Sequence, residues 1–171
     1  LYTRANTTTG GEGLYADAYR VAEDLRSAEP DVFAALTTIP WVFNNRAKTS
    51  SYKATGPVVE LDDAGEIRAV RYTTWLRAPM IAPLDVQNRA YRSVRRFAEL
   101  LKSPRYMMKV TYSAGDLFAF DNRRALHGRN GYDAAGGERF IEGVYSDRDE
   151  LHSAIRVLER ALLRDAAPAG A

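Results

Sequence analysis

Three short apolar segments follow one another in the second half of the chain, and they constrain the fold more than any other feature. They are "YMMKVTYS" (106–113), "GDLFAF" (115–120) and "RFIEGVYS" (139–146). Short runs of this kind, bounded by turn residues, are typical of strands. Because no helical segment separates them, they predict an antiparallel sheet or sandwich rather than a doubly wound parallel sheet.

Helical patterns surround this β region. The segment 17–28 places Ala18, Val21, Ala22 and Leu25 on one helical face, with Asp17 as the N-cap. Further helices are predicted over 30–37, 85–102 and 149–163, a hairpin around "DDAG" within 57–72, and a loop over 44–56. The predicted fold class is therefore mainly β with flanking helices (α+β), in one domain over 1–171 with a frayed tail at 165–171.

The composition excludes several classes of protein. The chain has no cysteine, which rules out disulfides and thiol nucleophiles and favours a cytoplasmic location. No apolar run approaches the ~20 residues of a membrane span. The net charge is only +2, so the basic stripe of Arg89, Arg92 and Arg96 is read as a solvated helix face rather than a nucleic-acid surface.

The segment "FDNRRALHGRNGY" (120–132) carries His127, one of two histidines in the chain, and Arg139 follows twelve positions later. In a strand, Arg139, Ile141, Gly143 and Tyr145 would share one face. An arginine that points inward needs an anionic partner, and the planar guanidinium matches a carboxylate. Alternation alone leaves open whether this face or the opposite one is buried.

The known motifs of several enzyme classes are absent. There is no His-x-Asp or His-x-Glu, so a site with two histidines and a carboxylate would have to recruit His152, which reads as a surface or packing residue of the last helix. There is no nucleophile elbow, Walker loop or dinucleotide fingerprint, and the glycines at 10–13 are read as a turn between a strand and the first helix.

Three strings together resemble a known family. "TTTGGEGLYADAYRVAEDL", "GDLFAFDNRRALHGRNGY" and "ERFIEGVYSDRDEL" are similar to the C-terminal half of the iron(II)- and 2-oxoglutarate-dependent oxygenases of the TauD/TfdA superfamily, in particular the γ-butyrobetaine and trimethyllysine hydroxylases. The similarity runs from about Leu1 to Leu163. The fold that it implies is a double-stranded β-helix (jelly roll), incomplete at its N-terminal side.

The resemblance also implies roles for individual residues. His127 matches the distal iron ligand, Arg139 the arginine that binds the distal carboxylate of 2-oxoglutarate, and Tyr145 an aromatic residue of the cage around a trimethylammonium group. Thr73 and Thr74 stand where these hydroxylases carry paired asparagines that help to seat the substrate, which leaves the substrate head group open. Gly13 stands where relatives commonly carry a hydroxyl residue that helps to hold the co-substrate.

The resemblance implies an enzyme that hydroxylates a small, γ-butyrobetaine-like substrate, as in carnitine biosynthesis, and decarboxylates 2-oxoglutarate to succinate. Its cofactors would be Fe(II), 2-oxoglutarate and O2, with ascorbate as an optional reductant. The His-x-Asp that supplies the other iron ligands would precede Leu1, so we expect this chain to be the C-terminal portion of one oxygenase catalytic domain and inactive alone.

The expected partner is a small-molecule substrate. We expect no binding to nucleic acid or membranes, and a homodimer is compatible with the sequence. The alternatives are a non-catalytic β-sandwich module that binds carboxylates, an inactive truncated relative of the oxygenases, and a basic helix that binds nucleic acid.

Overall fold

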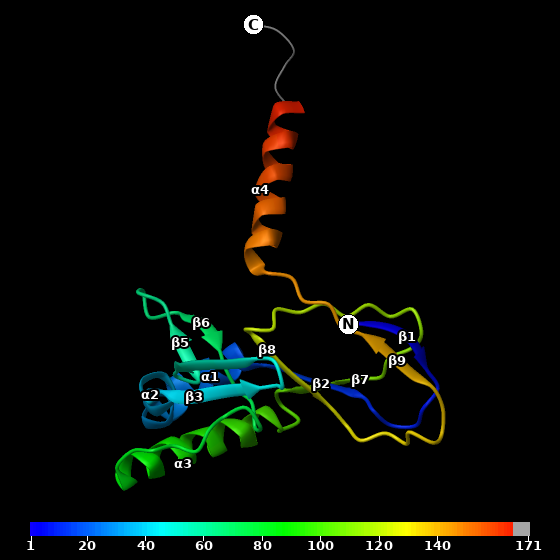
Figure 1. Cartoon of the computed structure of the whole chain (residues 1–171). Coiled ribbons are helices and arrows are strands. Elements are labelled where there is room, and N and C mark those ends of the chain that lie inside the picture. The colour runs from blue at the N-terminus through cyan, green and yellow to red at the C-terminus, as the bar shows by residue number, and fades with distance from the viewer. Residues whose placement is uncertain (166–171) are drawn as a thin grey trace, which may run out of the picture.

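The computed structural model describes residues 1–165, which form antiparallel strands and four helices (Figure 1). Every pair of strands described in this range is antiparallel, as predicted. In chain order the elements are β1 (Tyr2–Asn6), β2 (Gly13–Asp17), α1 (Ala18–Ala28), α2 (Pro30–Thr38), β3 (Trp41–Arg46), β4 (Ser51–Gly56), β5 (Val59–Leu61), β6 (Ile67–Val70), α3 (Leu84–Leu101), β7 (Met107–Val110), β8 (Ala125–Arg129), β9 (Arg139–Glu142) and α4 (Arg148–Asp165).

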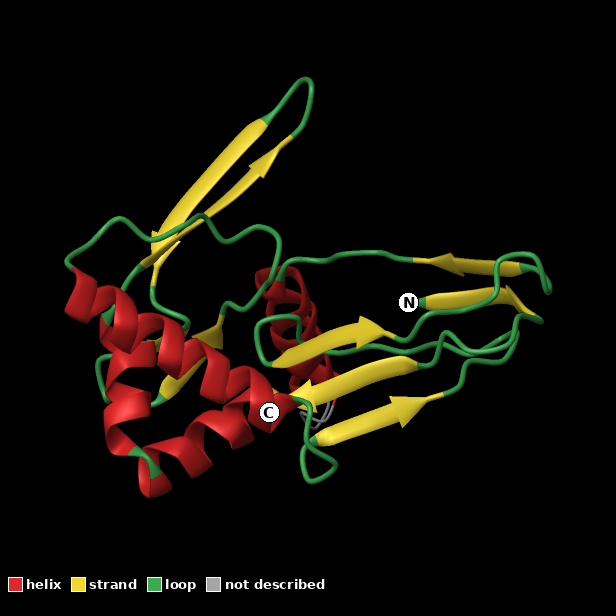
Figure 2. Ribbon diagram, turned by 90° about the horizontal axis from the view of Figure 1, so that it is seen from below, coloured by secondary structure: helices red, strands yellow, loops and turns green. Residues whose placement is uncertain are grey.

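Two small sheets form one side of the molecule. β2 lies between β7 and β8 in a three-stranded sheet, and β1 pairs with β9 in a second sheet. The segment around Leu117 runs along the other edge of β1, where Tyr2 and Leu117 form a bridge. Figure 2 shows these strands gathered on one side and α1 to α3 on the other, while α4 extends away from the rest in Figure 1.

The hydrophobic core lies among α1, α2, α3 and the β5–β6 hairpin. Its largest fully buried aromatic side chain is Phe97 of α3, which packs with Leu25 of α1 and Leu36 of α2. Asp17 is the N-cap of α1, as predicted, and its carboxylate accepts from the backbone N–H groups of Tyr19 and Arg20. The last strand residue of β2 therefore also starts the helix, which joins the core to the three-stranded sheet.

An ion pair ties α3 to the junction of α1 and α2. Arg96 donates to Glu29 through Nε and Nη2, at distances of 2.8 and 2.6 Å to Oε1. Arg96 thus has a structural role on the predicted basic stripe, whereas Arg89 and Arg92 are exposed.

Several predicted elements differ from the observed ones. The predicted loop over 44–56 is wrong, because β3 and β4 pair over six residues from Trp41–Gly56 to Arg46–Ser51. β4 is exposed along nearly its whole length, so it carries no alternation of apolar and polar residues. The predicted strand 115–120 is reduced to the bridge at Leu117, and the glycines at 10–13 join two strands, β1 and β2, rather than a strand and a helix.

The helices agree closely with the prediction, and the coarser fold class is confirmed as a mixed α/β structure with antiparallel strands. The predicted tail at 165–171 lies outside the described residues, apart from Asp165 at the end of α4. Within residues 1–165, none of the helices has the length and apolar character that crossing a membrane requires.

Replacing Phe97 with alanine should lower the free energy of unfolding by about 3–5 kcal/mol, because a fully buried aromatic side chain leaves both lost burial and a cavity. Urea denaturation followed by circular dichroism measures the change. Tyr52→Ala is the control, because this aromatic residue of the β4 strand is 70% exposed and its loss should cost less than about 0.5 kcal/mol. Equal losses in the two variants would contradict the assigned core.

Candidate functional site

His127 lies in the middle of β8, directly opposite Tyr15 of β2. Residues directly opposite in an antiparallel pair project to the same face, and the two rings stack with centroids 6.4 Å apart. The ring of Phe120 lies 4.8 Å from that of His127. Although part of the residue remains exposed, burial against these rings lowers the pKa of His127. The imidazole is therefore neutral at neutral pH, with a lone pair available for a ligand.

Arg139 begins β9, opposite Asn6 of β1. Its Nη1 donates to Asn6 Oδ1 at 3.0 Å and its Nη2 donates to the carbonyl oxygen of Gly11 at 2.8 Å. Both acceptors are neutral, and no carboxylate in the described part of the chain forms an ion pair with this guanidinium. Only two of its five N–H groups are used, so three can still bind an anion.

The contacts of β9 settle which face of this strand points inward. On one face, Ile141 lies opposite Thr3, which is 1% exposed. On the other face, Arg4 forms an ion pair with Glu142 at 2.7 Å and lies over the ring of Phe140, which is 48% exposed. Arg139 shares the inward face with Ile141. A β-bulge in β1 between Thr3 and Ala5 turns Asn6 to that same face, where it meets the guanidinium.

An aromatic cluster joins the surroundings of His127 to those of Arg139. The hydroxyls of Tyr15 and Tyr112 share a hydrogen bond, and the guanidinium of Arg139 lies 6.0 Å from the ring centroid of Tyr112. Asn6 also donates to the backbone carbonyl of Tyr112 at 2.7 Å. We use the name aromatic cluster for Tyr15, Tyr112, Phe118, Phe120 and His127, whose rings contact one another in series.

Two glycines are required by this packing. Gly11 has φ +74°, a left-handed conformation, and a Cβ there would lie 2.9 Å from Arg139 Nη1. A Cβ on Gly13 would run into the hydroxyl of Tyr112 and the ring of Tyr15. Sequence reasoning missed both tyrosines, because a lone tyrosine in a short strand looks like an ordinary core residue.

The other predicted site residues are not brought to this cluster by the contacts of the structure. Tyr145 is 82% exposed and lies beyond Glu142, the last residue of β9, so the strand alternation that placed it in phase with Arg139 does not reach it. Thr73 lies in the segment after β6 and has a buried hydroxyl without a hydrogen-bond partner among residues 1–165. Thr74 and His152 are exposed.

The described residues do not form a complete metal site. Within 1–165, no group of three or more His, Asp or Glu side chains is arranged to hold a metal ion. The role of His127 as an iron ligand stays a prediction, since no second metal-ligating side chain is grouped with it among these residues. At Arg139, by contrast, the guanidinium keeps three N–H groups that form no hydrogen bond among residues 1–165.

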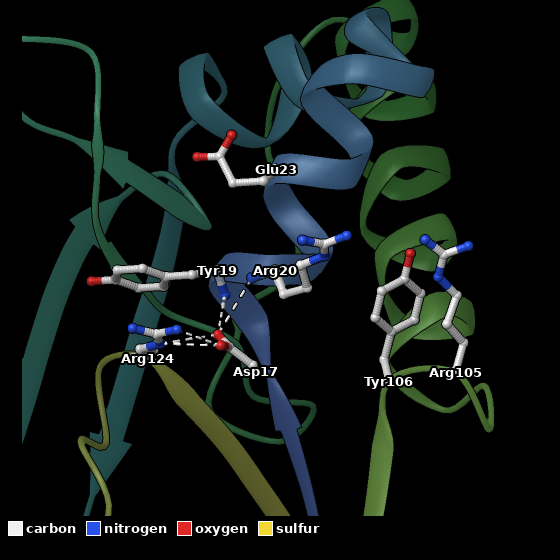
Figure 3. A pocket seen from close by; sticks show the side chains of 7 residues that line it. All are labelled: Asp17, Tyr19, Arg20, Glu23, Arg105, Tyr106 and Arg124. Atoms are coloured by element: carbon white, nitrogen blue, oxygen red, sulfur yellow. Dashed lines mark hydrogen bonds and ion pairs between the residues drawn. The ribbon is translucent and has the colours of Figure 1, made fainter.

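A separate hollow of about 410 Å³ lies at the start of α1 (Figure 3). Arg124 reaches Asp17 with Nη2 to Oδ2 at 2.6 Å, and Arg105 and Tyr106 both donate to Asp24. These charges are balanced within the chain. None of the predicted site residues lines this hollow.

Replacing Gly13 with alanine should lower the free energy of unfolding by about 1–3 kcal/mol, because the added methyl group overpacks the site of the two tyrosines. Gly128→Ala in the facing strand is the matched control, since a Cβ there meets nothing within 4 Å. Thermal and urea unfolding measure both changes. The loss should shrink when Tyr112→Phe is combined with Gly13→Ala; an undiminished loss would show that the hydroxyl is not the obstacle.

The lowered pKa of His127 predicts a pH dependence of stability. The folded state favours the neutral imidazole, so the unfolded state binds more protons as the pH falls. Stability should be full above the ordinary pKa of 6.5 and decrease as the pH falls through the lower folded-state value. Urea midpoints measured between about pH 8 and about pH 5.5, above the range where carboxylates titrate, test this. The urea midpoint should depend less on pH in His127→Gln, and as much as in the original chain in His152→Gln. A pH dependence that is lost in His152→Gln and kept in His127→Gln would contradict the assignment.

The chain is similar to known proteins along most of its length. Residues 1–145 match the family model described as "Taurine catabolism dioxygenase TauD, TfdA family". A γ-butyrobetaine dioxygenase of Pseudomonas sp. (strain AK-1) is 39% identical over 160 residues, which cover 94% of this chain and 42% of that protein. The human γ-butyrobetaine dioxygenase is 28% identical over 166 residues, or 94% of this chain and 43% of its own length.

A mitochondrial trimethyllysine dioxygenase of Gallus gallus is 30% identical over 156 residues, which cover 88% of this chain and 37% of that protein. The chain thus spans less than half the length of these relatives. The resemblance read from the three strings is confirmed, and the chain belongs to the TauD/TfdA dioxygenase family.

Proposed function

We propose that this chain is the C-terminal portion of the catalytic domain of an iron(II)- and 2-oxoglutarate-dependent dioxygenase, and that Arg139 binds a carboxylate of 2-oxoglutarate. The observation that carries the proposal is a partly buried guanidinium whose two hydrogen-bond acceptors, the Asn6 amide oxygen and the Gly11 carbonyl, are both neutral. A cation in such surroundings favours an anionic ligand, because an unpaired charge loses hydration without compensation. The planar guanidinium suits the two oxygens of a carboxylate.

His127 is proposed as one iron ligand. Its support is the neutral imidazole at the end of the aromatic cluster that leads to Arg139. The chain does not offer the remaining ligands among its described residues, so we propose that it is inactive alone and that they come from outside it. When bound, iron would supply the activation of O2, with ascorbate as an optional reductant.

The proposed substrate is a small γ-butyrobetaine-like molecule, as in carnitine biosynthesis, that is hydroxylated while 2-oxoglutarate yields succinate. Support comes from the names of the relatives, which are γ-butyrobetaine and trimethyllysine dioxygenases. We propose that the exposed ring of Tyr145 faces a quaternary ammonium group of the substrate. Thr73, whose buried hydroxyl has no hydrogen-bond partner among residues 1–165, and its exposed neighbour Thr74 are proposed to contact the substrate as well. The finer fold proposed is a jelly roll completed by residues outside this chain.

A second candidate function is a non-catalytic module that binds carboxylates. It is favoured because the described residues hold the Arg139 guanidinium in place but do not supply a set of metal ligands around His127.

We also propose a cytoplasmic location, which the cysteine-free sequence supports, and a homodimer.

Replacing Arg139 with methionine should weaken the binding of 2-oxoglutarate by about tenfold or more, because hydrogen bonds to charged groups contribute about 1.5–3 kcal/mol each. Isothermal titration calorimetry measures the affinity. Arg4→Met is the matched control: it removes an arginine from the neighbouring strand on the outward face and should leave the affinity unchanged.

Equal affinity of the Arg139→Met variant and the original chain would refute the proposal. The same titrations, with and without Fe(II) under anaerobic conditions, separate the two candidate functions when they are made on a longer chain that includes the proposed iron ligands from outside residues 1–171. Tighter binding with Fe(II) in that longer chain, lost in its His127→Ala variant, supports the oxygenase, whereas binding indifferent to Fe(II) there favours the module.

A further inference from the structure

The hydrogen bond between Tyr15 and Tyr112 leaves one buried phenolic hydrogen without an acceptor. Tyr15 is 5% exposed and Tyr112 is 6% exposed, and their hydroxyls contact each other. Each phenol carries one hydrogen, and the shared bond uses one of the two. In the described part of the chain neither hydroxyl has another partner. A buried donor without an acceptor is costly, so a hydroxyl in this position favours a ligand that accepts a hydrogen bond.

The direction of the free hydrogen follows from the neighbours of each ring. Tyr15 lies against Phe118, Phe120 and His127, at ring-centroid distances of 4.4, 5.3 and 6.4 Å. Among residues 1–165, the only hydrogen bond of the Tyr15 hydroxyl is the one with Tyr112. Tyr112 is the ring beside the guanidinium of Arg139. The order that uses both hydrogens therefore has Tyr15 donating to Tyr112, and Tyr112 donating to a group near Arg139.

Asn6 fixes Tyr112 and Arg139 relative to each other. Its amide Nδ2 donates to the backbone oxygen of Tyr112 at 2.7 Å, and its Oδ1 accepts from Arg139 Nη1 at 3.0 Å. The three unused N–H groups of the guanidinium and the free phenolic hydrogen thus belong to two residues that are both bonded to Asn6, Arg139 through its side chain and Tyr112 through its backbone. A carboxylate has about four lone-pair sites, enough to accept from both side chains.

Gly13 makes this arrangement possible. A side chain at position 13 could not coexist with the hydroxyl of Tyr112, which fills the space beside the Gly13 backbone. Position 13 of β2 therefore has no side chain, and the space beside its backbone is filled by the hydroxyl of Tyr112, which follows β7 in the chain.

We propose that the Tyr112 hydroxyl donates a hydrogen bond to the same ligand carboxylate that Arg139 binds, and that Tyr15 orients it. Tyr112 would be a binding residue and Tyr15 a positioning residue. The identity of the carboxylate as that of 2-oxoglutarate rests on the proposed function.

Calorimetry with 2-oxoglutarate tests the proposal on four variants. Tyr112→Phe should weaken binding about tenfold to a hundredfold, as expected for the loss of a hydrogen bond to a charged group. Tyr15→Phe should cost less, since Tyr112 keeps its hydrogen. Tyr106→Phe is the matched control, because that hydroxyl donates to Asp24 at 2.7 Å, outside the aromatic cluster. Arg139→Met reports on the proposed function itself.

A tyrosine difference spectrum distinguishes contact with the ligand from a merely structural role. Saturation with 2-oxoglutarate should perturb the near-ultraviolet absorbance of the original chain and of Tyr106→Phe, and much less that of Tyr112→Phe. The thermal midpoints of the ligand-free variants show whether each one folds. Should Tyr112→Phe not fold, the perturbation in Tyr15→Phe decides: its persistence supports Tyr112 as the donor, and its loss overturns that assignment.

The outcomes separate the two proposals. If Arg139→Met loses binding while Tyr112→Phe binds as the original chain does, the role of Tyr112 is overturned and the proposed function stands. If Arg139→Met binds unchanged, or the original chain does not bind 2-oxoglutarate, both are overturned.

Discussion

The site depends on how one guanidinium is held. Arg139 is positioned by the side chain of Asn6 and the backbone of Gly11, residues 133 and 128 positions away in sequence. These contacts require the pairing of β1 with β9, the bulge that turns Asn6 inward, and the left-handed backbone at Gly11. A slip of one residue in this register would send Arg139 to the outward face now occupied by Phe140 and Glu142. The position of this guanidinium is therefore a property of the tertiary structure, not of an isolated segment.

The molecule separates the parts that provide stability from the parts that provide chemistry. The largest buried side chains lie in α1 to α3 and the β5–β6 hairpin, whereas the aromatic cluster and Arg139 lie on the two small sheets. Asp17 joins the two parts, since it ends β2, caps α1 and pairs with Arg124 just before β8. Ala16 of β2 and Leu126 of β8 also pack with the core, so the helical part helps to orient the strands that carry Tyr15 and His127. A site on strands anchored in this way keeps its geometry better than one on loops.

Sequence reasoning found the helices and singled out His127 and Arg139, whose roles stay predictions, and its misses have physical causes. Helix patterns repeat over several turns and have caps such as Asp17, but β1 and β2 are too short to show a period, and β4 has no buried face. The direction of Arg139 could not be derived because both faces of "RFIE" are mixed; the partner strand decides it. Tyr145 was placed in phase on the assumption of a longer strand, but pairing ends at Tyr2 and Glu142. Tyr112 could not be identified as a site residue from the sequence, because its contacts are with Tyr15 and Asn6, which are far away in the chain.

The two ends of the aromatic cluster differ in how much they need from outside the chain. At Arg139, the described residues supply the cation, the acceptors that hold it and, in the proposed arrangement, a phenolic donor from Tyr112. At His127 they supply a single neutral imidazole. Preformed donors lose little conformational freedom when a ligand binds, whereas a metal held by one ligand gains little from the protein. In the proposed function, recognition of the carboxylate at Arg139 should therefore be separable from metal binding at His127, because the aromatic cluster lies between the two residues.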